Sequence, residues 1–312
     1  MVGSYNREYI IEETISALLF QDYPKDCYEI ILVDNGSTDN SIQIVEKSFN
    51  NDISTGKLKI LALMENSGSA GTYNHALSVA RQDWDYFLKM DEDLILDKYC
   101  VSALVKCAEY YPNTGMVGGK VFFHSEPTRL QTIGCKFSPF YTISKSIGKN
   151  SLRHKEYITE KKLDGVSGCM FLVSRKVKDR VGWFDQDYFL YYDDHDLMFK
   201  ALKKGFNNYF TPRAIGYHDT STGSLMKYTN SQWLYYSSRG GWMFFYKNYN
   251  KFSLSGVIYI LSYFFRSIAS FVLIIIISKG SNIKNLLGAY LSGFNHGLQK
   301  KTIGRFEIER FK

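Results

Sequence analysis

The sequence has few cysteines and no spacing that would pair them. The five cysteines stand at positions 27, 100, 107, 135 and 169, and no two of them form a C-x-x-C pair. An odd number of scattered cysteines does not suit a disulfide framework. The chain also opens without the basic and apolar segments of a secretory signal peptide. We therefore expect reduced thiols and a location on the cytoplasmic side of a membrane.

Two common nucleotide-binding fingerprints are missing as well. The chain has no G-x-x-x-x-G-K-[ST] phosphate loop and no G-x-G-x-x-G dinucleotide motif. The net charge is +7, but eight Lys/Arg and only two Glu lie from Ser253 onward, so the rest of the chain is almost neutral. A nucleic-acid-binding domain would spread its basic residues through a recognisable module. We expect no nucleic-acid partner.

Apolar, β-branched segments alternate with segments of helical spacing along the first two thirds of the chain. The predicted strands are 28–34, 57–63, 85–91, 116–123 and 165–173, and the predicted helices are 14–21, 40–49, 70–82 and 98–111. This alternation predicts an α/β fold with a mostly parallel sheet and helices on both faces. Ligands of such sheets bind beyond the carboxyl ends of the strands.

Three of these strands end in polar clusters, and we expect those clusters to meet at one edge of the sheet. Asp34 closes 28–34, before "NGSTDNS". The turn is either a plain link, with Asp39 or Asn40 capping the next helix, or a site where Asp34 accepts a hydrogen bond from a nucleobase or ribose. The stretch "NSGSAGTYNHAL" (66–77) places small residues just before a helix, where exposed N–H groups suit a pyrophosphate.

Three consecutive acids, Asp91, Glu92 and Asp93, follow the predicted strand 85–91. In extended backbone Asp91 and Asp93 would point to one side together. Two carboxylates facing one way predict a Mg²⁺ or Mn²⁺ site, which would also offset their repulsion. The alternative is a solvated acidic loop.

A second acidic cluster lies at Asp193, Asp194 and Asp196, where a helix is predicted to begin. Helix capping explains one or two of these carboxylates, and one of them could act as a general base. His218 follows another apolar segment. It is either a structural histidine or, if it lies beside Asp91 and Asp93, a further metal ligand.

The composition changes from about Ser221. Aromatic residues interleaved with Lys and Arg lead into 254–278, a segment whose only charge is Arg266. It is long enough to span a bilayer, which takes about 20 apolar residues, but a charge near its middle is costly there. We expect peripheral or monotopic attachment to an anionic membrane surface, with a true span or a buried homo-oligomer core as alternatives.

In order along 2–250, these features resemble the inverting family-2 glycosyltransferases of the GT-A fold, particularly bacterial rhamnosyl- and galactofuranosyltransferases of surface polysaccharide synthesis. The matching stretches are "SYNRE" (4–8), "QDYP" (21–24), "VDNGSTDNS" (33–41), N-x-G-x-A-G-x-x-N (66–74), D-x-D (91–93), 166–197 and "YY-x-x-R" (235–239). Each motif is weak alone, and the ordered series is specific. The resemblance implies a Rossmann-like catalytic domain over 1–220, with a nucleotide-sugar half over 1–95 and an acceptor half over 96–220. A helical membrane-associating region over 221–312 would follow.

The resemblance also implies residue roles. The donor-binding residues would be Tyr5, Asn6, Arg7, Asp34, Gly68, Gly71, Asn74, Asp91 and Glu92. Asp91, Asp93 and His218 would hold Mn²⁺ or Mg²⁺, Trp183 and Asp193 would lie on the acceptor side, and Asp194 would be the catalytic base. Two departures from the family pattern are the few residues before Tyr5, from a very short strand or a missing start, and "RGG" (239–241), where many relatives have Arg-Asn.

The activity implied is transfer of one sugar from a UDP- or dTDP-sugar to a hydroxyl of a glycan, with a lipid-linked glycan as the expected acceptor. A processive synthase would need Q-x-x-R-W and several spans, which this chain lacks. A sugar-phosphate nucleotidyltransferase would leave the Asp193–Asp196 cluster without a role. The non-enzymatic alternative is a membrane-attached scaffold with a degenerate nucleotide pocket.

Overall fold

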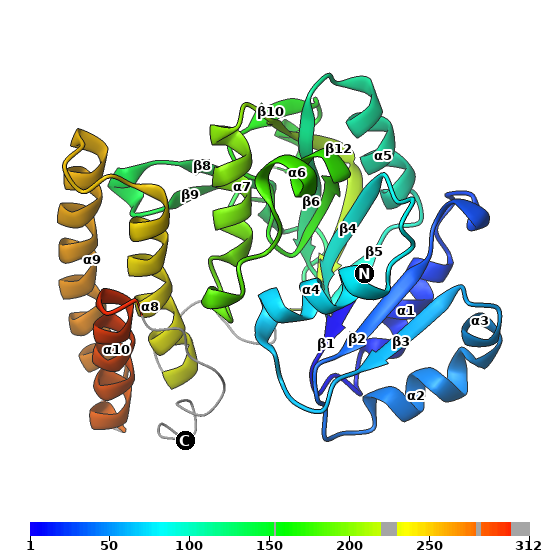
Figure 1. Ribbon diagram of the computed structural model, residues 1–312, viewed down its shortest axis with the longest axis horizontal. Coiled ribbons are helices and arrows are strands. Elements are labelled where there is room, and N and C mark those ends of the chain that lie inside the picture. Colours follow the sequence, from blue (N-terminus) through cyan, green and yellow to red (C-terminus); the bar gives the residue numbers. More distant parts are fainter. Residues whose placement is uncertain (153, 220–229, 279–281, 301–312) are drawn as a thin grey trace. The chain divides into compact units, whose positions relative to one another are not determined.

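A mixed ten-stranded sheet organises the first part of the molecule (Figure 1). The computed structural model describes residues 1–152, 154–219, 230–278 and 282–300. Two compact units are present. The sheet unit comprises Met1–Lys136, Ser146–Phe184 and Leu197–Thr220, and the helical unit comprises Phe137–Lys145, Asp185–Asp196 and Ser221–Lys312. Residues 137–145 and 185–196, which the predicted division placed in the catalytic domain, therefore group with the C-terminal helices.

The strands alternate with helices in the predicted manner over the first 123 residues. In chain order these elements are β1 (Val2–Ser4), α1 (Ile11–Leu19), η1 (Lys25–Cys27), β2 (Ile30–Asp34), α2 (Ser41–Ser48), α3 (Asn50–Ser54), β3 (Leu58–Ala62), α4 (Gly68–Val79), β4 (Tyr86–Asp91), β5 (Leu94–Leu96), α5 (Cys100–Tyr110) and β6 (Thr114–Phe123). At the start of α2, the Asp39 carboxylate accepts the backbone N–H of Ser41 (3.1 Å), whereas the Asn40 side chain makes no capping bond.

The remaining elements include the second half of the sheet and the C-terminal helices. They are β7 (Leu130–Thr132), β8 (Gly134–Phe137), η2 (Pro139–Tyr141), β9 (Ser144–Ile147), η3 (His154–Glu156), β10 (Lys161–Leu163), β11 (Met170–Ser174), α6 (Arg175–Val181), η4 (Gln186–Tyr188), α7 (Asp193–Lys203), β12 (Asn207–His218), α8 (Ser231–Asn248), α9 (Leu254–Ser278) and α10 (Ile283–Leu298). The predicted strand 165–173 begins only at Met170.

The main strand order is β10-β12-β6-β11-β4-β1-β2-β3, with β5 beside β12 and β7 beside β6. Parallel pairing joins β3, β2, β1 and β4, and also β6 and β12, whereas β11 runs antiparallel to both β4 and β6. The prediction of an α/β fold with a mostly parallel sheet is confirmed. The direction of β11 differs because the chain reaches it through β7 to β10, rather than through the single helix that a parallel crossover uses.

Helices cover both faces of the sheet. Val2 and Leu32 are fully buried in one core cluster with residues of α1 and α5. Gly3 lies toward the face opposite to the one that Val2 points to, and α4 packs on it there. The approach is so close that a Cβ at Gly3 would overlap the side chain of Thr72 in α4. This glycine lets α4 lie directly on the short central strand.

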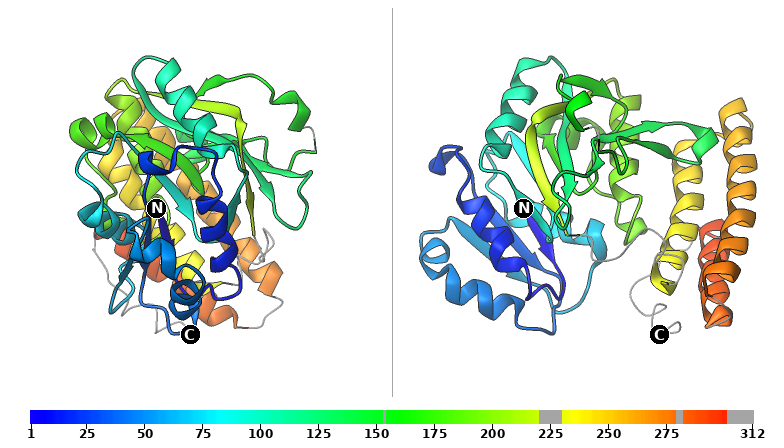
Figure 2. Two further views of the ribbon diagram at one scale, coloured as in Figure 1. Left: turned by 90° about the vertical axis from the view of Figure 1, so that its right-hand side faces the viewer. Right: turned by 180° about the vertical axis from the view of Figure 1, so that it is seen from behind.

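Within the helical unit, α8, α9 and α10 lie side by side (Figure 2). Gly293 of α10 faces the backbone of Tyr235 in α8, where a Cβ would not fit. The hydroxyls of Tyr259 and Tyr263 in α9 donate to the backbone carbonyls of Gly241 (2.7 Å) and Ser238 (2.6 Å) in α8. The three helices are thus joined by close backbone contacts and by hydrogen bonds.

Among the described residues, α9 is the one helix long and apolar enough to cross a membrane, judged by length and composition alone. The tail residues 221–229, 279–281 and 301–312 lie outside the described residues. With them lie five of the eight basic residues counted from Ser253 onward: Lys279, Lys301, Arg305, Arg310 and Lys312.

The pairing of β6 with β12 gives a stability prediction. The register shifts between Phe210 and Ile215 of β12, and Gly119 lies where a Cβ would overlap the Ala214 carbonyl and come within 2.7 Å of the Ala214 Cβ. We expect Gly119→Ala to lower the free energy of unfolding by about 1–3 kcal/mol in chemical denaturation, because the strands must separate to fit the methyl group. The control Ala62→Ser, at an exposed position of β3, should change it by less than about 0.5 kcal/mol. Equal stability of Gly119→Ala and the parent would contradict this strand packing.

Candidate functional site

The carboxyl ends of three neighbouring parallel strands bring the predicted donor-site residues to one edge of the sheet. In the register of β1, Ser4 pairs with Asp34 of β2, and Gly3 pairs with Asp91 of β4. The two acids and the segment that follows Ser4 therefore leave the sheet at the same level. This is the edge at which ligands of parallel sheets bind.

The segment after β1 is tied to the turn after β2. Tyr5 begins this segment, and Asn6 has a left-handed backbone with φ of 54°. The Asn6 N–H donates to Ser37 Oγ (2.9 Å), and its Oδ1 accepts the N–H of Thr38 (2.8 Å). The Arg7 N–H donates to Ser41 Oγ (2.9 Å). These bonds fix the predicted residues Tyr5 to Arg7 beside Asp34.

Asp34 offers an acceptor at this edge. The residue is buried, and Oδ2 accepts the N–H of Ser37 (3.2 Å), whereas Oδ1 has no hydrogen-bond partner among the described residues. A buried oxygen without a partner costs free energy that a donor group of a ligand would recover. The position suits an N–H of a base or a hydroxyl of a ribose.

The loop before α4 is held in shape by two asparagines. Asn35 Nδ2 donates to Asn66 Oδ1 (2.9 Å), and Asn35 Oδ1 accepts the N–H of Ser67 (2.8 Å). Gly68 has φ of +75°, a conformation that favours glycine, and a Cβ at Gly71 would lie 2.7 Å from the Ser67 Cβ. The loop therefore places backbone where a ligand could approach closely at the start of α4.

Two other predicted residues are held by contacts of their own. The side-chain amide of Asn74 donates to the carbonyls of Ala70 and Phe184 (both 2.9 Å). The Trp183 indole N–H donates to the Tyr73 carbonyl (3.3 Å). These bonds join α4 to the segment after α6. The predicted roles of Asn74 on the donor and Trp183 on the acceptor side stay predictions.

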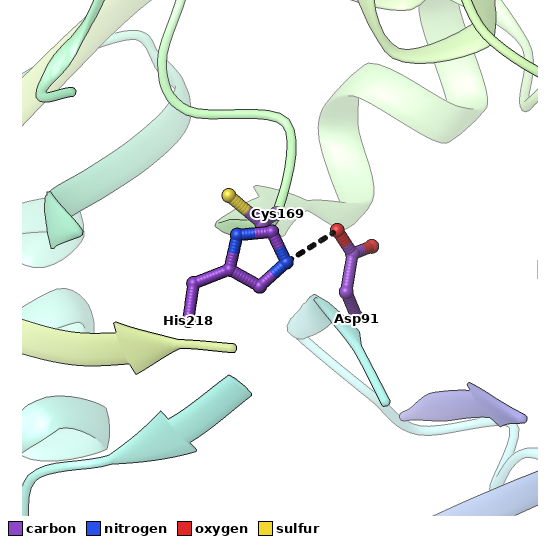
Figure 3. Close-up of side chains that lie close together, drawn as sticks. All are labelled: Asp91, Cys169 and His218. Atoms are coloured by element: carbon purple, nitrogen blue, oxygen red, sulfur yellow. Dashed lines mark ion pairs between the residues drawn. The ribbon is translucent and has the colours of Figure 1, made fainter. Parts of the chain in front are cut away.

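The predicted metal ligands face one another. His218 Nε2 lies 3.0 Å from Asp93 Oδ1 and 3.9 Å from Asp91 Oδ2 (Figure 3 shows the Asp91 pair). Residues 92 and 93 form a turn rather than a continuation of β4. The two carboxylates nevertheless meet the same imidazole, because β5 pairs with β12 at Leu94 and His218.

Cys169, which was not among the predicted site residues, belongs to the same cluster. Its Sγ, a carboxylate oxygen of Asp91 and a ring nitrogen of His218 all lie within 4.8 Å of one another. Oxygen, nitrogen and sulfur donors at this spacing fit a divalent transition-metal ion. The sequence signal was a cysteine just before an apolar strand, and its significance depends on the antiparallel pairing of β11 with β4.

Two cations offset the charge of the three consecutive acids. Lys89 is buried on β4, and its Nζ lies 2.5 Å from both Asp91 Oδ1 and the Gly168 carbonyl oxygen. Arg7 Nε lies 3.3 Å from Glu92 Oε1. The sequence shows a lysine between apolar residues of a predicted strand, but it does not show which groups this lysine would contact.

The surroundings shift the ionisation of these acids in opposite directions. Burial raises the pKa of Glu92 to about 7, against the opposing charge of Arg7. Burial would also raise the pKa of Asp93, but the hydrogen bond and charge of His218, together with Arg7, outweigh it and lower that pKa. Asp93 is therefore anionic near neutral pH, and Glu92 is only partly ionised.

In the helical unit, Asp193 and Asp194 open α7. Asp193 is buried, and Asp194 Oδ1 accepts the N–H of His195 (2.7 Å) and lies 2.8 Å from His195 Nδ1. The other ring nitrogen, His195 Nε2, lies 3.0 Å from Ser144 Oγ. The carboxylate of Asp194 is thus oriented by its own neighbour, which is held in turn by a serine from β9.

Helix α8 fixes the segment that leads to these acids. Arg239 is fully buried and donates through Nη1 to the Tyr188 carbonyl (3.1 Å) and through Nη2 to the Asp187 carbonyl (2.6 Å). Lys247 Nζ bridges the carboxylates of Asp185 (2.6 Å) and Asp187 (2.7 Å). The arginine of the "YY-x-x-R" stretch therefore supports the backbone just before α7.

The third acid of the cluster, Asp196, is also held by a residue of α8. The buried Asp196 Oδ1 accepts the Tyr188 hydroxyl (3.1 Å) and the Asn248 amide (2.6 Å). Three non-glycine residues of the intervening backbone have positive φ: Phe189, Tyr191 and Tyr192. Such conformations are costly and persist where surrounding contacts impose them. The hydrogen bonds from Arg239 and Asn248 of α8 are among the contacts that hold this backbone.

Comparison with known proteins identifies the fold and the family. Residues 1–182 match Glycosyl transferase family 2. A poly-β-1,6-N-acetyl-D-glucosamine synthase of Staphylococcus aureus is 24% identical over 216 residues, which cover 69% of this chain and 48% of that protein. The chain thus spans about half the length of the curated relatives it matches.

Two solved structures show the same fold. A mannosyltransferase of Pyrobaculum calidifontis, in complex with GDP-Man and Mn²⁺, aligns with a TM-score of 0.58 and 16% identity over 96% of this chain and 86% of that one. Residues 1–349 of TarS from S. aureus align with a TM-score of 0.55 and 18% identity over 99% of this chain and 81% of that one. The predicted GT-A-like fold is confirmed by these likenesses, and the family by the match over residues 1–182. The chain belongs to glycosyltransferase family 2.

Proposed function

We propose that this protein transfers one sugar from a UDP- or dTDP-linked donor to a hydroxyl of a glycan, with inversion at the anomeric carbon, in cell-surface polysaccharide synthesis. The observation that carries the proposal is that Asp34, Asp91 and His218 close strands at one edge of the sheet. Asp93, in the turn after β4, lies 3.0 Å from His218 there. Relatives that include a polysaccharide synthase support a role in glycan synthesis.

Donor binding would use the edge of the sheet formed by β1, β2 and β4. The free oxygen of Asp34 would accept a hydrogen bond from the base or ribose. Asp91, Asp93 and His218 would hold a divalent cation, Mn²⁺ or Mg²⁺, against the diphosphate. When bound, such a cation stabilises the negative charge that develops on the leaving diphosphate. Glu92, the remaining acid of the three, would stay paired with Arg7.

Asp194 would act as the general base. Its carboxylate would take the proton of the acceptor hydroxyl while that oxygen forms a bond to the anomeric carbon. The bond between this carbon and the diphosphate oxygen breaks, and the nucleoside diphosphate leaves with its electron pair. The hydrogen bonds with His195 would hold the Asp194 carboxylate in one orientation while it accepts the proton.

The acceptor would be a lipid-linked glycan reached at the cytoplasmic face of a membrane. The exposed side of α9 carries a continuous apolar stripe: Leu254, Val257, Leu261, Phe264, Phe265, Ile268, Val272, Ile275 and Ile276. The neighbouring η2 adds exposed Phe140 and Tyr141, and Lys145 lies over the Tyr141 ring at 5.4 Å. Apolar, aromatic and cationic side chains in this arrangement suit an anionic lipid surface.

Attachment along the side of α9 fits its contacts better than a span does. The stripe is on one side of the helix, whereas Tyr259 and Tyr263 on another side are bonded to α8. The guanidinium of Arg266 donates to Thr142 Oγ1 (2.7 Å). Insertion of α9 alone across a bilayer would separate it from these partners, whereas contact of the stripe with lipid headgroups and upper acyl chains would keep the bonds.

The metal site gives the first functional prediction. With a panel of UDP- and dTDP-sugars and a suitable glycan acceptor, Mn²⁺ should support release of nucleoside diphosphate from one donor, and EDTA should abolish it. Asp93→Asn should lower this release about 10²-fold or more, because a charged ligand at the diphosphate is lost. The control Asp83→Asn, an exposed acid before the other end of β4, should leave it unchanged. Undiminished turnover with EDTA would refute the metal dependence.

The base gives the second prediction. We expect Asp194→Asn to keep donor affinity and to lower sugar transfer by roughly 10²-fold or more, the usual effect of losing a general base. Donor binding would be measured by calorimetry and transfer by product formation. Asp179→Asn, in the exposed part of α6, is the matched control. Near-normal transfer by Asp194→Asn would assign the base to another residue.

The apolar stripe gives the third prediction. The double variant Phe265→Ser and Ile268→Ser should lose most flotation with vesicles containing anionic phospholipid, because two exposed apolar side chains of the stripe are removed. Phe20→Ser removes an equally exposed phenylalanine from α1's C-terminal end and should float like the parent. Equal flotation of all three proteins would contradict attachment through α9.

A further inference from the structure

The candidate cation-binding cluster of the sheet unit includes the thiol of Cys169. Asp91 closes β4, Cys169 precedes β11 and His218 closes β12, and Figure 3 shows that the three side chains lie close together. The donor atoms of the three residues lie within 4.8 Å of one another. A cluster of this composition differs from a site built from carboxylates alone, because its three donors belong to three classes of ligand.

Strand pairing places the thiol there. Met170 pairs with Met90 in the antiparallel ladder of β11 and β4. The next bond of this ladder runs from the Asp91 N–H to the Cys169 carbonyl (3.0 Å). Cys169 therefore sits opposite Asp91 by the register of the sheet, and not through the conformation of a free loop.

The neighbouring groups also suit a bound sulfur. Ser167 Oγ lies 3.1 Å from Cys169 Sγ, at a distance where its hydroxyl can donate to the sulfur. His218 Nδ1 lies 3.0 Å from Gln131 Oε1, which leaves Nε2 directed toward the acids. Hydrogen bonds from outer residues that orient ligands in this way are a regular feature of metal sites.

We propose that Cys169 coordinates the divalent cation of this site as a thiolate, together with Asp91, Asp93 and His218. The inference rests on the proposed metal-dependent function and deepens it. On binding, the sulfur–metal bond forms and the thiol proton passes to solvent. Sulfur and imidazole donors favour thiophilic ions such as Co²⁺, Zn²⁺ or Cd²⁺, whereas Mg²⁺ prefers oxygen ligands. The site would therefore rank Co²⁺ and Mn²⁺ above Mg²⁺.

The test measures Co²⁺ bound to the intact 312-residue chain by absorption spectroscopy, with no turnover required. The parent and Cys27→Ser, which changes an exposed cysteine outside the cluster, should show a sulfur-to-cobalt charge-transfer band. Cys169→Ser and Cys169→Ala should lack the band and bind Co²⁺ roughly tenfold or more weakly, with Mg²⁺ affinity nearly unchanged. A band that persists without Cys169, or an equal loss of affinity for both ions, would overturn the proposal.

A second measurement uses the unmodified protein, so it does not depend on a variant that folds. Peptide mapping after brief maleimide treatment gives the alkylation rates of Cys169 and of the exposed Cys27 in the same sample. Co²⁺ should slow the reaction at Cys169 at least about tenfold and leave Cys27 unchanged, since a coordinated thiolate is no longer a free nucleophile. Equal rates at Cys169 with and without Co²⁺ would count against coordination.

The outcomes also separate this inference from the proposed function. If donor turnover needs Mn²⁺ and is lost in Asp93→Asn while the cobalt complex shows no sulfur band, the metal-dependent function stands and the thiolate ligand is wrong. If the parent binds no cation and turns over its donor in EDTA, both are wrong.

Discussion

The central constraint of this structure is the pairing of one three-residue strand with two partners. β1 hydrogen-bonds to β2 on one side and to β4 on the other, and its register aligns Ser4 with Asp34 and Gly3 with Asp91. The absence of a side chain at Gly3 lets α4 approach directly. This register brings both strand ends and the start of α4 to the same edge. The candidate donor site is a consequence of this alignment.

Three adjacent acids at that edge are tolerated because each has a compensating neighbour. Lys89 lies beside Asp91, Arg7 beside Glu92, and His218 beside Asp93. Burial makes unpaired charge expensive, so these contacts lower the free energy of the folded protein before any ligand binds. They also give neighbouring acids different properties, because the pKa of Asp93 is lowered whereas that of Glu92 is raised to about 7. Neighbouring acids of one short stretch therefore differ in charge near neutral pH.

The sequence predicted the elements whose signals are local. Periodicity located β2, β3, β4 and β6, and the polar residues after β2 and β4 indicated a common edge. What it could not predict depends on partners far along the chain. Cys169 joins Asp91 only through an antiparallel strand, and Ser144 reaches His195 from a hairpin about fifty residues earlier. Arg239 was identified by its motif, but its carbonyl partners required the backbone of 187–188 to be known. Such contacts follow from topology, which hydrophobic patterning does not specify.

The bonds between α9 and α8 have a practical consequence for anyone preparing this protein. An apolar helix is the segment usually deleted to avoid detergent, but here its tyrosines satisfy the carbonyls of Gly241 and Ser238. A chain cut before Leu254 would uncover those groups and loosen α8, which carries Arg239 and Lys247. The backbone ahead of Asp194 would then lose its supports, while the core beneath β1 to β4 would stay intact. If Asp194 is the base, such a fragment would bind donor through the sheet unit yet transfer no sugar, and that result would not describe the intact enzyme.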